Sequence, residues 1–204
     1  PARRIVRLRL GAIPAGLQPL TPSALPPVVA HAASPARLWA LLPGAGSGTR
    51  AHAGQPKQYV AVAGRPMVLH TLAAFALVAR LAGVLVVVAP GERFFDAPAQ
   101  GPTPAWPVAA CGGAPRAETV ARGLDALCRA GAAETDWVLV HDAARCLVEP
   151  AWIDRLIDAC SNDPVGGLLA QPVADTLKRA RLEQVEATVD RSVHWLAQTP
   201  QMFR

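Results

Sequence analysis

Three glycines alternate along a short segment that follows an apolar run, namely Gly44, Gly46 and Gly48, and Arg50 stands just beyond them. Glycine lets a backbone approach a ligand closely and adopt positive φ, and successive free N–H groups form a concavity that binds anions. Lys57 follows a proline turn and can add a second full positive charge. The spacing therefore predicts a phosphate-binding loop. Its candidate binding positions are Pro43, Gly44, Ala45, Gly46, Ser47 and Gly48.

The loop does not match three other glycine motifs. A P-loop needs a lysine followed by Ser or Thr, whereas this loop ends in Thr49 and Arg50. The dinucleotide fingerprint needs its third glycine where Thr49 stands and an acid about 20 residues later, but the first acid of the chain is Glu92. A nucleophile elbow at Ser47 needs glycine at Ala45 and Thr49. For the loop alone, a plain structural turn stays open.

A second group of polar residues follows the apolar run Trp137–Val140. In open α/β sheets ligands bind outside the carboxyl ends of the strands, so Asp142 and Arg145 stand where chemistry is usual. The Asp142 carboxylate can hold Mg²⁺ beside phosphates or cap the next helix, and both interpretations stay open. We interpret His141 as structural, because a histidine at a strand end commonly satisfies nearby backbone groups.

A pair of glycines, Gly112 and Gly113, breaks the chain before a third group. Arg116 and Thr119 follow, and Thr119 is expected on the first turn of a helix, where a hydroxyl can face a ligand. One interpretation is a second loop wrapped around a base or sugar. The other is an ordinary helix start, and the residues alone leave both open.

The charge of the chain is distributed unevenly. With 204 residues, 51% of them hydrophobic and 17% charged, the chain can bury a substantial core. The formal net charge is +5, yet the first 91 residues carry nine basic residues and no acid. Nucleic acid is not the expected partner, because the basic residues are scattered and only 5% of residues are aromatic. We expect a small phosphorylated ligand instead.

The cysteines are too far apart for a zinc motif or a C-x-x-C redox motif. We interpret them as reduced, small buried residues of a cytoplasmic protein. No membrane span is predicted, because the apolar stretch Leu69–Pro90 is interrupted by His70, Arg80 and Gly83. The cysteines are Cys111, Cys128, Cys146 and Cys160.

Residues 1–36 are expected to form a disordered tail. They include seven prolines, four arginines in the first nine positions and no acid, a composition that cannot build a packed core. A targeting segment is the alternative, although the prolines interrupt both a helix and a continuous apolar region.

From Leu38 onward, apolar runs alternate with segments of helical spacing. This order predicts one α/β domain over residues 37–204 with βαβ units and a mostly parallel sheet. The predicted strands are Leu38–Leu42, Val84–Val88, Trp137–Val140 and Gly166–Val173. One predicted helix begins at Pro66 and is ended by Gly83. The other two span Arg116–Arg129 and Pro150–Cys160.

A protruding hairpin arm is predicted at about residues 172–194. Two ribbon strands, Asp175–Arg179 and Ala187–Val193, are joined by a polar turn around Arg181–Gln184. Thr176 and Arg191 on this hairpin are candidates for contact with another subunit.

Taken in order, these motifs make residues 38–204 resemble the 2-C-methyl-D-erythritol 4-phosphate cytidylyltransferase family, nucleotidyltransferases of isoprenoid precursor synthesis. The resemblance implies a three-layer, Rossmann-like nucleotidyltransferase fold. The matching segments are the glycine loop to Arg50, Pro56–Tyr59, Gly112–Val120, Val140–Arg145, Asp175–Lys178, Thr188–Arg191 and Gln198–Gln201.

The resemblance also implies a reaction, in which CTP and methylerythritol phosphate give the cytidine diphospho-alcohol and pyrophosphate, with Mg²⁺ bridging the phosphates. Arg50 and Lys57 would be the catalytic residues that stabilise the developing charge. Asp142 would face the ribose and the metal. Besides the glycine loop, the nucleotide-binding residues would be Gly112, Gly113, Arg116, Thr119, Asp142 and Ala143.

By the same resemblance, the polyol phosphate lies between two subunits of a homodimer. Thr176 and Arg191 would reach the neighbouring subunit's substrate, and Thr199 its own. The substrate-binding residues would then be Asp142, Arg145, Thr176, Arg191 and Thr199.

The chain departs from the family pattern in a few places. Ala114 stands where a polar residue is frequent, and Cys146 stands where proline is usual. The carboxyl-terminal part that supplies a further aspartate and lysine is expected to be missing, and a fusion to a cyclodiphosphate synthase is open. Alternatives are another sugar- or alditol-phosphate nucleotidyltransferase and a non-catalytic nucleotide-binding module.

Overall fold

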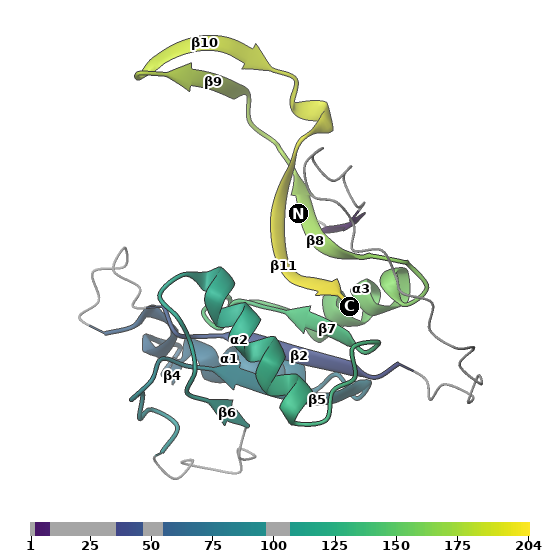
Figure 1. The fold of residues 1–204 in the computed structure, drawn as a ribbon. Coiled ribbons are helices and arrows are strands. Elements are labelled where there is room, and N and C mark those ends of the chain that lie inside the picture. The colour runs from purple at the N-terminus through teal and green to yellow at the C-terminus, as the bar shows by residue number, and fades with distance from the viewer. Residues whose placement is uncertain (1–2, 9–35, 47–54, 97–106) are drawn as a thin grey trace, which may run out of the picture.

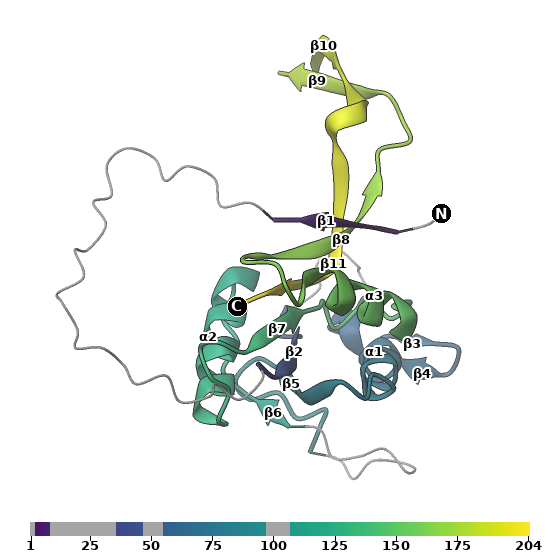
Figure 2. The same cartoon turned by 90° about the vertical axis from the view of Figure 1, so that its right-hand side faces the viewer.

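The computed structural model describes residues 3–8, 36–46, 55–96 and 107–204. Its described residues form a seven-stranded sheet in the order β1-β8-β11-β7-β2-β5-β6, with helices on both faces (Figures 1 and 2). The strands of this sheet are β1 (Arg4–Arg7), β2 (Leu38–Pro43), β5 (Leu81–Val87), β6 (Val108–Ala109), β7 (Trp137–Val140), β8 (Gly166–Pro172) and β11 (Trp195–Phe203). The helices are α1 (Met67–Ala76), α2 (Arg116–Arg129) and α3 (Pro150–Cys160).

Two hydrophobic clusters separate the layers, because successive side chains of a strand point to opposite faces. Ala40 and Leu42 of β2 belong to the cluster beneath α1 and α3, whereas Leu41 between them belongs to the cluster beneath α2. Figure 2 shows α2 on one side of the sheet and the other two helices on the opposite side. The three-layer α/β prediction is therefore confirmed.

The sheet is mixed, so the prediction that it is mostly parallel is confirmed only in part. β2 is parallel to β5 and β7, and β5 is parallel to β6. β11, however, lies antiparallel to both β7 and β8, and β1 is antiparallel to β8. The difference arises because the last strand of the chain inserts between β7 and β8.

The arm is a two-stranded hairpin of β9 (Leu177–Arg181) and β10 (Gln184–Val189), followed by the short helix η3 (Arg191–Val193). Leu182 and Glu183 link the strands with φ of 48° and 64°, as a tight two-residue hairpin turn requires. Figure 1 shows the arm projecting from the body of the domain.

Part of the predicted tail is ordered. Arg4–Arg7 pair with β8 along the edge of the sheet, and Ile5 packs against the core. The Arg3 guanidinium lies 4.1 Å from the centre of the Trp152 ring, so a cation–π contact anchors the start of this strand. Residues 1–2 and 9–35 of the predicted tail lie outside the described residues.

The predicted helix end at Gly83 is wrong. The helix α1 ends at Ala76, and Gly83 lies inside β5. A Cβ at this position would stand 2.7 Å from the Trp39 ring. Gly83 is therefore needed for close packing against Trp39 rather than for ending a helix.

A small hairpin of β3 (Ala61–Val62) and β4 (Arg65–Pro66) precedes α1, and the short helix η2 (Lys57–Tyr59) precedes β3. Beside η2, the Tyr59 ring stacks on Phe94 with ring centres 4.3 Å apart. Tyr59 is the last residue of η2, so this packing holds the end of the short helix that Lys57 begins.

Candidate functional site

Three loops meet at the carboxyl ends of the parallel strands. The Gly44 N–H donates to the Val87 carbonyl at 2.7 Å, which joins the glycine loop to the end of β5. The Ala143 N–H donates to the Pro43 carbonyl at 3.3 Å, which joins it to the loop after β7. These backbone contacts place the first half of the glycine loop between the end of β5 and the loop after β7. Ligands of open α/β sheets bind at this edge, outside the carboxyl ends of the strands.

Gly112 brings the two glycine motifs into contact. Its N–H donates to the Val88 carbonyl at 2.8 Å. A Cβ at position 112 would collide with the Ala45 side chain and lie 2.9 Å from the Val88 carbonyl oxygen. Only glycine permits this approach of the two backbones. The predicted binding residues Gly44, Ala45 and Gly112 are thus brought together.

Two polar side chains hold the loops in place. Gln58, which is buried, donates from Nε2 to the Gly44 carbonyl at 2.7 Å. The Thr119 hydroxyl donates to the Gly113 carbonyl at 2.9 Å and accepts from the Gly113 N–H at 3.1 Å. Thr119 is itself buried, so the structure gives its hydroxyl a role in shaping the second loop. Its predicted contact with a nucleotide stays a prediction.

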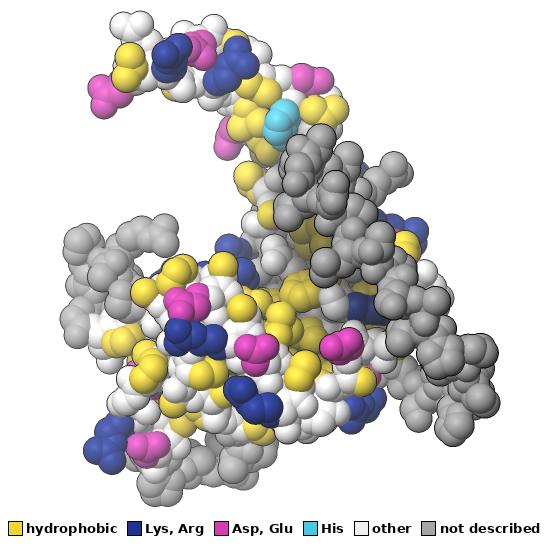
Figure 3. All heavy atoms as spheres, in the orientation of Figure 1, with side chains coloured by type: hydrophobic (Ala, Val, Ile, Leu, Met, Phe, Trp, Pro, Cys, Tyr) yellow, Lys and Arg dark blue, Asp and Glu magenta, His cyan; other side chains and the backbone are white. Residues whose placement is uncertain are grey.

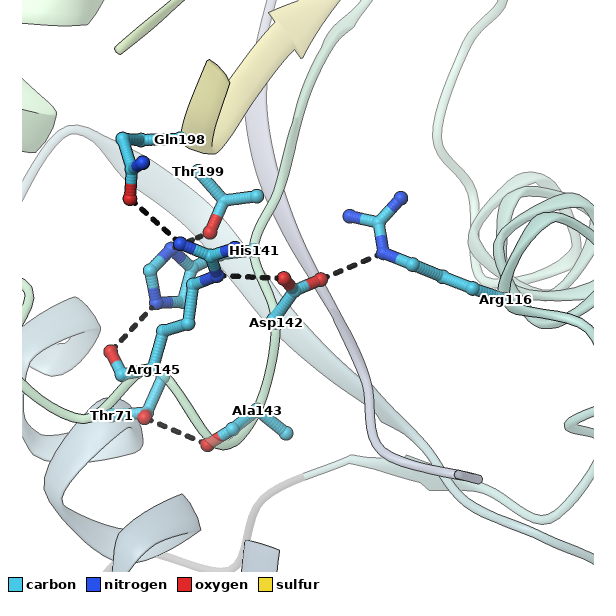
Figure 4. A network of polar contacts seen from close by, with 8 residues as sticks. All are labelled: Thr71, Arg116, His141, Asp142, Ala143, Arg145, Gln198 and Thr199. Atoms are coloured by element: carbon cyan, nitrogen blue, oxygen red, sulfur yellow. Dashed lines mark hydrogen bonds and ion pairs between the residues drawn. The ribbon is translucent and has the colours of Figure 1, made fainter. Parts of the chain in front are cut away.

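Asp142 joins two arginines from different elements (Figure 4). Arg116 at the start of α2 donates from Nε to Oδ1 at 2.7 Å, and Arg145 donates from Nε to Oδ2 at 2.9 Å. Burial alone would raise the pKa of Asp142, but the hydrogen bonds and charges of the two arginines outweigh it and lower the pKa. Asp142 is therefore ionised, with two cationic side chains beside it.

Behind this ion pair, His141 anchors the loop after β7 from the core. The Arg145 carbonyl can only accept, so His141 donates from Nε2 at 3.1 Å, and its Nδ1 accepts from the Thr199 hydroxyl at 3.0 Å. Burial lowers the pKa of His141 to about 4, which keeps the ring neutral. Thr71 adds a bond from its hydroxyl to the Ala143 carbonyl at 2.9 Å.

These contacts agree with the structural interpretation of His141. They also occupy the hydroxyl of Thr199, which is 4% exposed, so its predicted contact with substrate stays a prediction. Sequence reasoning did not single out Gln58 or Thr71. Gln58 at least follows directly after Lys57, whereas nothing in the sequence distinguishes Thr71 inside its apolar helix.

Of the two predicted catalytic cations, Lys57 and Arg50, the structure describes only Lys57. Lys57 is exposed at the start of η2, next to the buried Gln58 that bonds the glycine loop. Arg50, Ser47 and Gly48 lie outside the described residues.

Thr176 and Arg191 lie on the arm and are exposed, and Arg191 donates to the Ala174 carbonyl. Within the part of the chain that the structure describes, no hydrogen bond or ion pair joins either residue to the three loops. The prediction that they reach another subunit therefore remains untested.

The described residues hold neither a metal-binding cluster of His, Cys, Asp and Glu side chains nor a membrane-spanning helix. No group of three or more His, Cys, Asp and Glu side chains there is arranged to hold a metal ion. No helix there is long and apolar enough to span a membrane. The four cysteines, all within the described ranges, are free thiols, as predicted, but only Cys160 is buried. Cys111 and Cys146 are partly exposed and Cys128 is exposed, so the prediction that all four are buried is wrong.

The family model for 2-C-methyl-D-erythritol 4-phosphate cytidylyltransferase matches residues 38–204. The chain is similar to the bifunctional enzyme IspD/IspF of Albidiferax ferrireducens, with 59% identity over 180 residues that cover 88% of this chain and 43% of that protein. It is also similar to the 2-C-methyl-D-erythritol 4-phosphate cytidylyltransferase of Laribacter hongkongensis, with 54% identity over 175 residues that cover 82% of this chain and 72% of that protein.

Among solved structures, the crystal structure of a 4-diphosphocytidyl-2C-methyl-D-erythritol synthase has a TM-score of 0.70 and 42% identity to this chain. The match covers 83% of this chain and 75% of that one. The chain thus spans less than half the length of the bifunctional relative and about three quarters of the length of the other two proteins.

Proposed function

Because the chain belongs to the 2-C-methyl-D-erythritol 4-phosphate cytidylyltransferase family, we propose that it transfers a cytidylyl group from CTP to 2-C-methyl-D-erythritol 4-phosphate and releases pyrophosphate. One observation of the structure carries this proposal. Gly112 packs so closely on Ala45 that the two glycine loops form one surface, and Asp142 with its two arginines lies at the end of the neighbouring strand β7.

In the proposed reaction, a phosphate oxygen of the polyol phosphate attacks the α-phosphorus of CTP. The new phosphorus–oxygen bond forms as the bond from the α-phosphorus to the bridging oxygen of the β-phosphate breaks, and pyrophosphate leaves with that electron pair. Negative charge builds on the non-bridging oxygens and on the leaving group, so the residues mainly position and stabilise it. Arg50 and Lys57 are the proposed cations for this charge.

We propose Mg²⁺ as the cofactor, with Asp142 as its protein ligand. Mg²⁺ typically takes one or two carboxylates, with water and substrate phosphates as its other ligands. A carboxylate has about four lone-pair positions, and the two arginines use one on each oxygen of Asp142. A single metal contact therefore fits this carboxylate. When bound, Mg²⁺ would neutralise part of the triphosphate charge.

We further propose a homodimer formed through the arm. Exposed hydrophobic side chains lie along the arm and at its base, among charged ones (Figure 3). Leu182 is 89% exposed and Val193 is 71% exposed, and apolar groups of this kind favour burial against a partner. In such a dimer, Thr176 and Arg191 would contact the substrate of the other subunit. Location in the cytoplasm remains a prediction, supported by the four free thiols.

The proposed activity is tested by measuring pyrophosphate release from CTP by the full-length gene product that carries this chain. Release should require both Mg²⁺ and methylerythritol phosphate. Turnover of UTP or GTP with a sugar phosphate would instead refute the proposed substrates. Size-exclusion chromatography with light scattering tests the dimer, which a monomer at micromolar concentration would contradict.

A further inference from the structure

Gln198 lies where β11 leaves its regular pairing. β11 pairs with β8 at Trp195–Ala197 and again at Gln201–Phe203, and the register shifts between the two segments. Figure 4 shows the side chains of Gln198 and Thr199, from this irregular segment, directed toward the loop that follows β7. The strand that returns from the arm therefore contacts the candidate site at this point.

The amide of Gln198 holds the side chain of Arg145. Arg145 donates from Nη1 to Gln198 Oε1 at 2.7 Å, while its Nε donates to Asp142 Oδ2 at 2.9 Å. Two partners on different nitrogens fix both the direction of a guanidinium group and the orientation of its plane. Arg145 is nevertheless 46% exposed, so it can still meet a ligand.

A neutral acceptor suits this role. A second carboxylate at position 198 would hold Arg145 too, but it would also offset the positive charge that attracts a phosphate. The amide oxygen of Gln198 orients the guanidinium without adding negative charge. Thr199 acts differently, because its hydroxyl bonds His141 and so supports the backbone of the loop.

We propose that Gln198 is a positioning residue for the phosphate of the polyol substrate and acts through Arg145. This inference rests on the proposed function, under which Arg145 contacts that phosphate. Gln198 itself need not touch the substrate. Among the described residues, its loss would leave the Arg145 guanidinium held by the Asp142 carboxylate alone, so the side chain could rotate away from the productive orientation.

The test is steady-state kinetics of Gln198→Met in the full-length gene product, since methionine keeps the length of the side chain and removes the acceptor. The KM for methylerythritol phosphate should rise about tenfold, as loss of one hydrogen bond to a charged group implies. The KM for CTP and the kcat should stay within about twofold. The matched control is Gln171→Met on β8, a glutamine opposite Leu196 that should leave both KM values unchanged.

The same substitution in an Arg145→Ala background shows whether Gln198 acts through Arg145. There it should have no further effect on the KM for methylerythritol phosphate. Three results would overturn this inference without affecting the proposed function. They are an equal rise in the KM for CTP and for methylerythritol phosphate, no rise in either KM, and a rise in the KM for methylerythritol phosphate that persists in the Arg145→Ala background. A parent enzyme that does not use methylerythritol phosphate would refute the proposed function and, with it, this inference.

Discussion

Replacing Gly112 with alanine is expected to force the two glycine loops apart. The new Cβ would collide with the Ala45 side chain and lie 2.9 Å from the Val88 carbonyl oxygen, where ordinary contacts begin at 3.4 Å. Overpacking of this kind costs about 2 kcal/mol, which lowers the Tm of a domain of this size by about 4–8 °C. Relief of the collision also requires a shift of about 1 Å, and misplacement on that scale can reduce turnover about 100-fold.

The assays are thermal unfolding by circular dichroism, calorimetric titration with CTP, and pyrophosphate release. Gly46→Ala is the control for packing, because no atom of the residues that the structure describes lies within 4 Å of a Cβ there, and its Tm should match that of the parent. A double variant with Ala45→Gly removes the main collision and should recover part of the lost Tm. Parental Tm and CTP affinity in Gly112→Ala would refute the close-approach argument.

Four other substitutions are informative. Lys57→Ala and Arg50→Ala should each reduce turnover about 100-fold or more. The Tm of Lys57→Ala should stay within about 2 °C of the parent, because this lysine is exposed. Near-normal rates in both variants would mean that other residues supply the catalytic positive charge. Asp136→Asn should cost about 2 kcal/mol in urea unfolding; an unchanged midpoint would contradict the stabilising role of this carboxylate. His141→Gln should flatten the stability profile between pH 6.5 and 4, whereas an unaltered profile would mean that another group titrates there.

The Asp136 prediction depends on a set of hydrogen bonds on one buried carboxylate. Asp136 accepts from the Arg37 N–H at 2.9 Å, from Trp39 Nε1 at 2.9 Å and from the Ala133 N–H at 3.0 Å. Burial alone would raise the pKa of Asp136, but these bonds and the Arg37 side chain outweigh it and lower the pKa to about 2. The stability that Asp136 adds is therefore present above pH 4 and is lost as the pH falls toward 2.

The His141 prediction has a different origin and a higher pH window. The unfolded chain binds a proton near pH 6.5, whereas the buried ring in the folded chain does so only near pH 4. As the pH falls between these values, the unfolded state gains a proton that the folded state does not. Stability therefore falls over this range, by up to about 3 kcal/mol in the parent protein.

Local sequence patterns determined several elements to the residue. Arg116–Arg129, Trp137–Val140 and Pro150–Cys160 have the predicted bounds. Apolar periodicity marks each of them, and Pro115 and Pro150 stand at the starts of the two helices. These signals act within a few residues, so neighbours in the sequence suffice to define the element. The position of Asp142 at the end of a buried strand, and hence at a ligand-binding edge, followed in the same way.

The tertiary structure decided which distant segments meet. β1 pairs with β8, and β11 pairs with both β7 and β8. No local pattern predicted β1 and β11, because Arg4–Arg7 are rich in arginine and the segment around Gln198 is polar and contains proline. The contact of Gly112 with Ala45, and the bonds of Asp142 to Arg116 and of Arg145 to Gln198, join residues 26 to 67 positions apart. Such pairings depend on how strands and helices pack, which the sequence of any one segment does not contain.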